Sequence, residues 1–332
     1  MQLTVSAVIP VHNAAPDLAR CLESLRQSSV QPLECIVVDD GSTDESPDVA
    51  RAAKARVLST GGRRGPAVAR NLGARAASGD LLFFLDADVA VHRHAIRRML
   101  ERFADSPPAD AVIGSYDDAP PGGGIVSQYK NLQHHYVHQN GSPEANTFWT
   151  GCGMVRRDVF LEAGGFDEGF AEPSIEDIEL GYRLRMAGRR IVLEKSAQVK
   201  HFKQWTLMSL LRTDILLRGM PWTELSLRYR RLPNDLNVSG SQRASVALVW
   251  GAAAAAPIAL LLRHPLIAVA GGMALSAVLA INSGFYRFLA QRRGALFAVP
   301  AAALHVLYFF YCGLAFALGL SKYLLHRKGG PV

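Results

Sequence analysis

The chain has 332 residues, 49% of them hydrophobic, and a formal net charge of +7. This hydrophobic fraction is that of an ordinary globular protein, but residues 241–332 hold 8 of the 36 Lys and Arg residues and none of the 29 Asp and Glu residues. The basic excess therefore indicates residues flanking lipid-embedded segments, and it argues against a nucleic-acid partner.

Apolar runs and amphipathic stretches alternate along the first part of the chain. We expect strands at residues 5–11, 34–38, 57–58 and 81–85, and helices at residues 16–28, 46–55 and 67–77. This alternation predicts βαβ units, and hence an α/β fold built on a doubly wound, mainly parallel sheet.

Acidic residues follow two of these strands. Asp39 and Asp40 end the second strand, and Asp86 and Asp88, separated by Ala87, end the fourth. The carboxyl ends of parallel strands share one edge of the sheet, where open α/β folds bind their ligands. Residues two apart in a strand point to the same side, so the second pair suits Mg²⁺ or Mn²⁺. The alternative is a strand that ends in two solvated acids.

Other motifs exclude some enzyme classes. The first strand is not followed by Gly-x-Gly-x-x-Gly, and the chain has no Gly-x-x-x-x-Gly-Lys-Ser/Thr, which argues against a dinucleotide oxidoreductase and a P-loop enzyme. The basic, glycine-rich loop at residues 61–66 either meets phosphates or is an ordinary solvated turn. The first residues lack the pattern of a signal peptide, and the four cysteines lack metal or redox spacing, so we expect a cytosolic, reducing environment with buried thiols.

Four segments, at residues 8–13, 37–44, 65–71 and 86–88, together resemble family 2 glycosyltransferases in order and spacing. The resemblance covers roughly residues 3–205 and implies a GT-A type fold. It implies that the Asp-x-Asp motif binds a metal bridging the donor diphosphate and that an acid after the second strand holds the nucleotide base. The nucleotide-sugar site that it implies comprises Pro10, Asn13, Asp39, Asp40, Arg70, Asp86, Ala87 and Asp88.

The resemblance extends to a metal ligand and a catalytic base. It implies that His201 completes a Mn²⁺ or Mg²⁺ site with Asp86 and Asp88, the alternative being a lone surface histidine. It also implies that Asp177 is the general base, with Glu176 in reserve, since an inverting transfer needs one carboxylate to deprotonate the acceptor. Ser174 and Asp177 have the spacing of a capping box at a helix start, so a structural role is the alternative.

The rest of the chain has membrane character. We expect a GT-A catalytic domain at residues 1–201, interfacial amphipathic helices at 202–240 and a membrane domain at 241–332 with spans at about 244–262, 266–282 and 295–320. The second span is short and needs its flanks to cross. His305, inside the third, is either functional or a neutral histidine bonded between helices. The alternative for residues 202–240 is a globular helix pair packed on the sheet.

The charges leave the topology open. A cytosolic catalytic domain with Arg287, Arg292 and Arg293 on the same side satisfies the positive-inside rule. Three crossings then put Lys322, Arg327 and Lys328 outside, against that rule. Either the last span is re-entrant or the short tail overrides the bias.

These observations predict a multi-pass cell-envelope enzyme whose catalytic domain faces the cytosol. We expect it to transfer one sugar, with inversion and metal dependence, from a nucleotide-diphosphate sugar such as a UDP-sugar to a membrane-associated or lipid acceptor. Transfer of a single sugar is expected because the chain has no Gln-x-x-Arg-Trp, the pattern of the family's processive synthases. The alternatives are a polyprenyl-phosphate glycosyl synthase, a non-catalytic membrane-anchored nucleotide-sugar-binding protein and a soluble enzyme with a hydrophobic tail.

Overall fold

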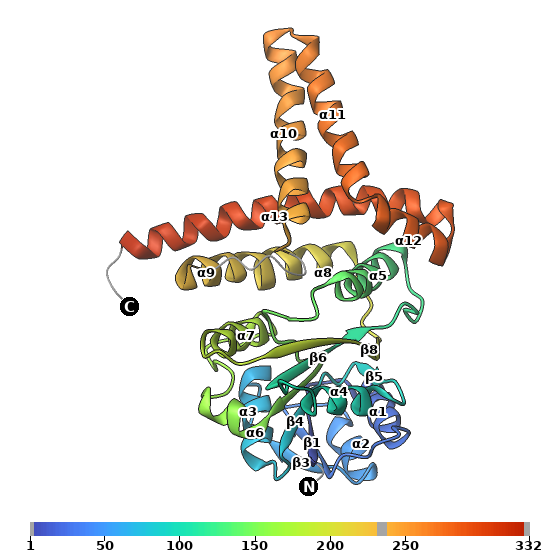
Figure 1. Ribbon diagram of the computed structural model, residues 1–332, viewed down its shortest axis with the longest axis vertical. Helices are drawn as coiled ribbons and strands as arrows, with labels where there is room; N and C mark the ends of the chain where they lie inside the picture. Colours follow the sequence, from blue (N-terminus) through green and yellow to red (C-terminus); the bar gives the residue numbers. More distant parts are fainter. Residues whose placement is uncertain (1–2, 231–237, 329–332) are drawn as a thin grey trace. The chain divides into compact units, whose positions relative to one another are not determined.

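The computed structural model describes residues 3–230 and 238–328, with side chains up to residue 325 (Figure 1). Its chain separates into two units. The N-terminal unit comprises residues 1–121 and 137–203, and the C-terminal unit comprises residues 122–136 and 204–332. Residues 122–136 thus group with the C-terminal unit, although the sequence analysis assigns them to the catalytic domain. The part of the expected interfacial segment at residues 231–237 lies outside the described residues.

Within the described residues of the N-terminal unit, eight strands form one sheet in the order β3-β2-β1-β4-β7-β6-β8-β5. β1 to β4 pair in parallel, whereas β7 runs antiparallel between β4 and β6, and β5 runs antiparallel to β8. The expected mainly parallel α/β sheet is therefore confirmed. The strands are β1 (Val5–Val11), β2 (Glu34–Asp39), β3 (Arg56–Ser59), β4 (Leu81–Leu85), β5 (Val89–Val91), β6 (Ala111–Tyr116), β7 (Cys152–Arg156) and β8 (Ile191–His201).

Helices cover both faces of this sheet, so its central strands are buried on both sides. In β4, Phe83 and Leu85 join a core with helices on one face, and Phe84 packs on the other face against Phe160 and Phe166 at 5.2 and 5.1 Å between ring centroids. The first face carries α1 (Ala15–Arg26), α2 (Ser46–Ala52) and α4 (Ala95–Phe103), and the second carries α3 (Pro66–Ala76), α6 (Arg157–Glu162) and the neighbouring α7 (Glu176–Met186).

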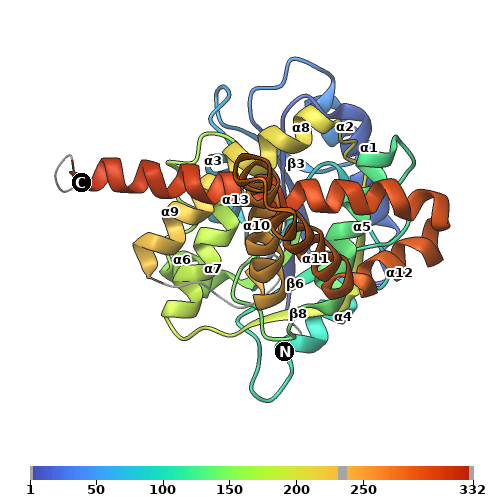
Figure 2. The same ribbon diagram turned by 90° about the horizontal axis from the view of Figure 1, so that it is seen from above.

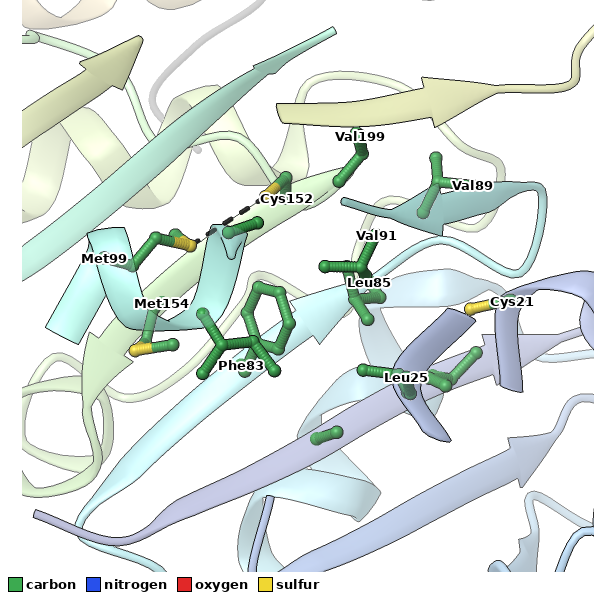
Figure 3. Close-up of a cluster of buried hydrophobic side chains, with 14 of the residues drawn as sticks. Cys21, Leu25, Phe83, Leu85, Val89, Val91, Met99, Cys152, Met154 and Val199 are labelled. Atoms are coloured by element: carbon green, nitrogen blue, oxygen red, sulfur yellow. Dashed lines mark hydrogen bonds between the residues drawn. The ribbon is translucent and has the colours of Figure 1, made fainter. Parts of the chain in front are cut away.

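Figure 3 shows the core on the first face, where Phe83 and Leu85 lie among side chains from α1, α4 and β7. Cys21 and Cys152 are fully buried free thiols within it, as expected from their lack of metal spacing. Each fully buried aromatic or aliphatic side chain contributes about 1.5–3 kcal/mol. This core fixes the edge of the sheet at which β1, β2 and β4 end.

The far edge of the sheet is longer than the sequence analysis expected. The apolar residues 191–193 predict a short last strand there, but β8 continues to His201. Its extension holds polar residues between the buried Ala197, Val199 and His201, so no continuous apolar run reveals it. β5 is three residues long, and it pairs Val89 with His201.

The C-terminal unit is helical. A hairpin of two long helices, α10 and α11, projects from α13 in Figure 1, and in Figure 2 the hairpin is seen end-on while α13 is seen along its full length. Residues 125–136 of α5 (Ile125–Asn140) also belong to this unit. The others are α8 (Leu207–Arg212), a π-helical segment η1 (Thr213–Gly219), α9 (Met220–Tyr229), α10 (Gly240–Leu262), α11 (Pro265–Ile281), α12 (Ser283–Arg293) and α13 (Ala295–Lys328).

Two of these helices are long and apolar enough to cross a membrane, namely α10 and residues 295–325 of α13. α11 and α12, which meet at a bend of 60°, pass the same test only as a pair. The three expected spans thus coincide with helices. The middle span, α11, passes the test only together with the flanking helix α12, as expected from its short length. His305 of α13 is buried, with Nδ1 3.3 Å from the Tyr286 hydroxyl of α12, which fits a histidine bonded between helices.

Candidate active site

The ends of β1 and β2 bring three of the expected nucleotide-site residues to one edge. The register places Pro10 opposite Val38, and Asp39 is the last residue of β2. Asn13 follows β1 in a left-handed backbone conformation (φ 50°), and its Oδ1 accepts a hydrogen bond of 2.7 Å from Thr43 N–H. This bond ties the loop after β1 to the loop after β2, so the edge is held from both strands.

Asp39 and Asp40 have different environments. Asp40 is buried, and its carboxylate accepts hydrogen bonds from the backbone N–H of Arg64 and Gly65, each at 2.8 Å, and from the Thr60 hydroxyl at 2.9 Å. Asp40 thus organises the glycine-rich loop, and two N–H groups of that loop are committed to it rather than to a phosphate. Asp39 is half-buried at the strand end, where its Oδ1 accepts from Ser42 N–H at 2.9 Å.

Gly65 makes this arrangement possible. Its φ is 95°, and a Cβ added there would lie 2.5 Å from the backbone oxygen of Ala171. Only glycine combines that conformation with so close an approach. The glycine-rich loop, held by Asp40, therefore leads directly into α3. This helix carries the next site residue, Arg70.

Arg70 joins two carboxylates from distant parts of the chain. Its Nη2 donates to Asp86 Oδ1 at 2.7 Å, and its Nη1 donates to Glu176 Oε1 at 2.7 Å. Arg70 and Glu176 are buried. Burial alone would lower the pKa of Arg70, but the charges of Asp86, Glu176 and Asp177 raise it. The guanidinium therefore remains charged and fixes α3, β4 and α7 around one point.

Glu176 and Asp177, at the start of α7, are held differently. The Oε2 of Glu176 accepts from Ser174 N–H at 2.9 Å, so both of its oxygens have partners. Asp177 is half-buried, and its Oδ2 accepts from the N–H and hydroxyl of Thr150 at 3.2 and 3.3 Å. Burial, and then the charge of Glu176, raise the pKa of Asp177 from 3.8 to about 6.

Ser174, which the capping-box spacing places at the helix start, is not the N-cap residue of α7. The N-cap of α7 is Ile175, and within the described residues no side-chain hydrogen bond caps this helix. Asp177 is therefore positioned by Thr150 and by the start of its own helix. A half-buried carboxylate with a pKa near neutrality has the properties of a general base.

Asp88 lies beside His201 at the pairing of β5 with β8. His201 Nε2 is 3.5 Å from Asp88 Oδ2, and the backbone oxygen of Asp88 accepts from Phe202 N–H at 2.8 Å. His201 is buried and stacks on Tyr116, with 4.5 Å between ring centroids. Burial opposes ionisation of Asp88, but the charge of His201 and the hydrogen bond from it outweigh this and lower the pKa of Asp88. His201 is thus not a lone surface histidine.

Comparison with known proteins identifies the fold that carries this site. Residues 6–164 match the model of glycosyl transferase family 2. Residues 6–164 therefore carry a family 2 glycosyltransferase domain. The matched range includes the strand ends at Asp39 and Asp88, and Arg70 between them.

Curated relatives of this glycosyltransferase domain catalyse different transfers. A pre-mycofactocin glycosyltransferase from Mycobacterium tuberculosis is 36% identical over 208 residues, covering 59% of this chain and 42% of the relative. A validoxylamine A glucosyltransferase from Streptomyces hygroscopicus is 33% identical over 220 residues, covering 55% and 52%. The chain therefore spans about half the length of these relatives.

The structural likeness extends over both units. A mannosyltransferase from Pyrobaculum calidifontis, solved in complex with GDP-Man and Mn²⁺, has a TM-score of 0.59 at 19% identity, covering 98% of this chain and 88% of that one. At this identity the likeness establishes the fold alone. It confirms the expected GT-A type glycosyltransferase fold followed by further helices.

The glycosyltransferase domain only partly assembles the expected metal ligands. Asp88 and His201 lie side by side, whereas the Oδ1 of Asp86 binds Arg70. Among the residues that the structure describes, no group of three or more His, Cys, Asp or Glu side chains is arranged to hold a metal ion. A carboxylate beside an imidazole nevertheless fits Mn²⁺ or Mg²⁺, so Asp88 and His201 are the pair that suits a metal here.

The sequence analysis missed three residues that position the site. Thr150 binds Asp177, Tyr116 packs on His201, and Thr60 binds Asp40. The sequence predicts a strand at residues 111–114, but β6 continues to Tyr116, so Tyr116 is a further strand end at the site. Thr150 and Thr60 lie in loops with no periodic pattern, and only the folded chain brings them to their partners.

Proposed function

We propose that this protein transfers a single sugar, with inversion, from a nucleotide-diphosphate sugar to a membrane-associated acceptor. The observation that carries the proposal is the cluster in which Arg70 holds Asp86 and Glu176 next to Asp177. This cluster joins the donor side of a family 2 domain to a carboxylate whose raised pKa suits it to take the acceptor proton. A UDP-sugar is the donor we propose, and the catalytic domain would face the cytosol.

The other residues would bind and orient the donor. Asp39, at the end of β2 beside Pro10, would hold the nucleotide base, and Asp40 would keep the glycine-rich loop in place. Glu176 would hold Arg70 rather than act as the base, since both of its oxygens are occupied.

Asp177→Asn tests the assignment of the base. The amide cannot accept a proton, so we expect turnover to fall by about 10²–10⁴-fold with donor binding retained. Release of nucleoside diphosphate measures turnover, and Glu162→Gln, an exposed carboxylate on α6, is the matched control. A nearly unchanged rate would contradict the base and favour a lipid phosphate as nucleophile, because a phosphate needs no deprotonation.

Asp88 and His201 would hold the divalent metal, with Asp86 adjacent. When bound, the ion would offset the charge that develops on the leaving diphosphate. Asp88→Ala and His201→Ala should each abolish the rise in unfolding temperature that Mn²⁺ gives in the presence of a nucleoside diphosphate. Asp117→Ala, a nearby buried acid that contacts His92, is the control. Retention of the Mn²⁺ effect in Asp88→Ala would rule out this metal site.

We also propose that only α10 and α11, the latter with help from the flanking α12, cross the membrane and that α13 lies along its surface. Both halves of α13 pack on helices that carry charges. Ala301 packs with Tyr129 of α5, and Lys322 forms an ion pair of 2.8 Å with Glu224 of α9. Neither α5 nor α9 is long and apolar enough to span a membrane. Two crossings return the chain to the side on which it entered, so every basic segment flanking the hairpin lies on one side.

A further inference from the structure

The C-terminal unit contains a cavity of about 680 Å³, a volume typical of sites for small organic ligands. It lies between the η1–α9 segment, α10, α13 and the part of α5 that belongs to this unit. Its walls are largely apolar and aromatic and include Trp222, Leu227, Val246, Phe309 and Phe316. Phe316 is 53% exposed, so the apolar lining continues to the surface of the helices.

Basic residues contribute the charge of this cavity. Lys130, Arg218, Arg230 and Arg243 line it, and Asp214 is the one acid among its described lining residues. Arg218 is half-buried, whereas Arg230 and Arg243 are exposed. Arginine remains charged at all accessible pH values and binds phosphate through paired N–H groups. An apolar cavity with several arginines therefore fits an anion attached to an apolar chain.

The single acid does not cancel this charge. Asp214 Oδ2 accepts from Lys130 Nζ at 2.7 Å and from the Tyr311 hydroxyl at 2.8 Å, and all three side chains are buried. Lys130 and Asp214 thus neutralise each other, so the remaining positive charge among the described lining residues is that of the arginines. Asp214 and Arg218 both belong to the π-helical segment η1, a rare conformation that is frequent at functional sites.

One polar group in the lining has no internal partner. The buried Oε1 of Gln242 lacks a hydrogen-bond partner among the described residues. A buried amide without a partner costs free energy, which a polar group of an occupant would recover. Gln242 and Arg243 both line the cavity from α10.

From these features we infer that the cavity binds an anionic phospholipid from the bilayer, with its phosphate at Arg218, Arg230 and Arg243 and its chain along Trp222 and Phe316. The inference rests on the membrane association that forms part of the proposed function. It does not depend on the transfer reaction, because the residues that line the cavity belong to the C-terminal unit and include none of the proposed catalytic residues.

The test measures lipid binding to the full chain in a neutral detergent, without donor or metal. Phosphatidylglycerol, phosphatidylcholine and diacylglycerol with identical acyl chains are titrated separately, and bound lipid is counted by native mass spectrometry. We expect phosphatidylglycerol to bind about tenfold more tightly than the other two, since a charge-assisted hydrogen bond typically contributes at least that factor. Diacylglycerol has no phosphate, and the choline cation of phosphatidylcholine offsets its phosphate and is repelled by the arginines. Inorganic phosphate at millimolar concentration should not displace it, because the apolar walls hold the chain.

Variants locate the site. Arg218→Gln and Arg243→Gln should each weaken phosphatidylglycerol binding by about tenfold and leave phosphatidylcholine binding unchanged. Arg287→Gln is the matched control, because Arg287 is an exposed arginine of the same unit that does not line the cavity. Unchanged unfolding temperatures would establish that the variants fold.

Three results would overturn the inference. Equal binding of the three lipids would mean a purely apolar cavity, and displacement by inorganic phosphate would mean an anion site without a lipid. An equal loss of binding in Arg287→Gln would mean nonspecific attraction to a basic surface. Each is distinguishable from a failure of the proposed transfer, because Asp177→Asn is expected to bind lipid normally.

Discussion

Asp177 is half-buried beside a second carboxylate, so its protonation state should control the pH dependence of turnover. Burial and the charge of Glu176 raise its pKa to about 6. Because a base must be ionised to act, kcat/KM should be constant above this pKa and fall about tenfold for each pH unit below it. Initial rates measured from about pH 4.5 to 8 check this. The pKa of Asp88 is lowered, so its titration lies below this range.

Two variants assign this acid limb to Asp177. Glu176→Gln removes the neighbouring charge and should move the limb to lower pH, whereas Glu162→Gln, at an exposed position, should leave it unchanged. An acid limb that stays near pH 6 in Asp177→Asn would mean that another group titrates there.

At the residue scale, the sequence predicts which residues lie at the candidate site, but it does not predict which partner each of them contacts. Asp39, Asp40, Asp86 and Asp88 follow strands, and the parallel topology brings strand ends to one edge whatever their partners are. Their partners depend on loops. Asp40 faces the backbone of residues 64–65, and Asp86 faces Arg70. Both contacts depend on the path of the loop before α3, whose N-cap is Gly65, and the sequence does not give that path.

At the element scale, Arg70 links three elements that are distant in sequence. It lies on α3 and binds Asp86 after β4 and Glu176 at the start of α7. Arg70→Met leaves Glu176 buried without its partner, which should lower the free energy of unfolding by about 3–5 kcal/mol. Urea unfolding of the purified chain, followed by tyrosine and tryptophan fluorescence, measures this change.

The same helix supplies the control. Arg75 of α3 forms a 3.6 Å ion pair with Glu168, and both side chains are exposed, so Arg75→Met should cost about 0–1 kcal/mol. Arg70→Lys should be intermediate, because one ammonium replaces two parallel contacts imperfectly. Equal costs for Arg70→Met and Arg75→Met would mean that the buried ion pairs do not hold α3, β4 and α7 together.

The elements themselves were predictable wherever hydrophobic periodicity is strong. β1, β2, β4 and the helices between them follow it closely. The end of β8 and all of β5 were not predicted, since β5 is three residues long and lies at the sheet edge. β7 runs antiparallel to β4, and the long connection through α5 precedes it. The order of the elements along the chain does not predict the direction in which the chain re-enters the sheet after that connection.

At the scale of the whole molecule, the sequence left the last helix unresolved, because charge and hydropathy point in opposite directions. α13 is apolar enough to cross a membrane, but a third crossing separates its basic end from the basic residues of α12. Packing within the C-terminal unit favours the charge argument. Ala301 lies against α5, and Lys322 pairs with Glu224 of α9.

Single cysteines, introduced after replacement of the four native ones, test this topology. We place them at Arg263→Cys in the turn between α10 and α11, at Gln291→Cys near the end of α12, and at Ser321→Cys in α13, all exposed positions. A membrane-impermeant maleimide applied to intact cells and to inverted vesicles reports which side each position faces. We expect the Arg263 position to face the outside, and the other two to face the cytosol with the catalytic domain, because a hairpin of two crossings returns the chain to its starting side.

Labelling of the Ser321 position from the same side as the Arg263 position would mean that α13 crosses the membrane. Protection of all three positions would mean that the hairpin does not reach the far surface.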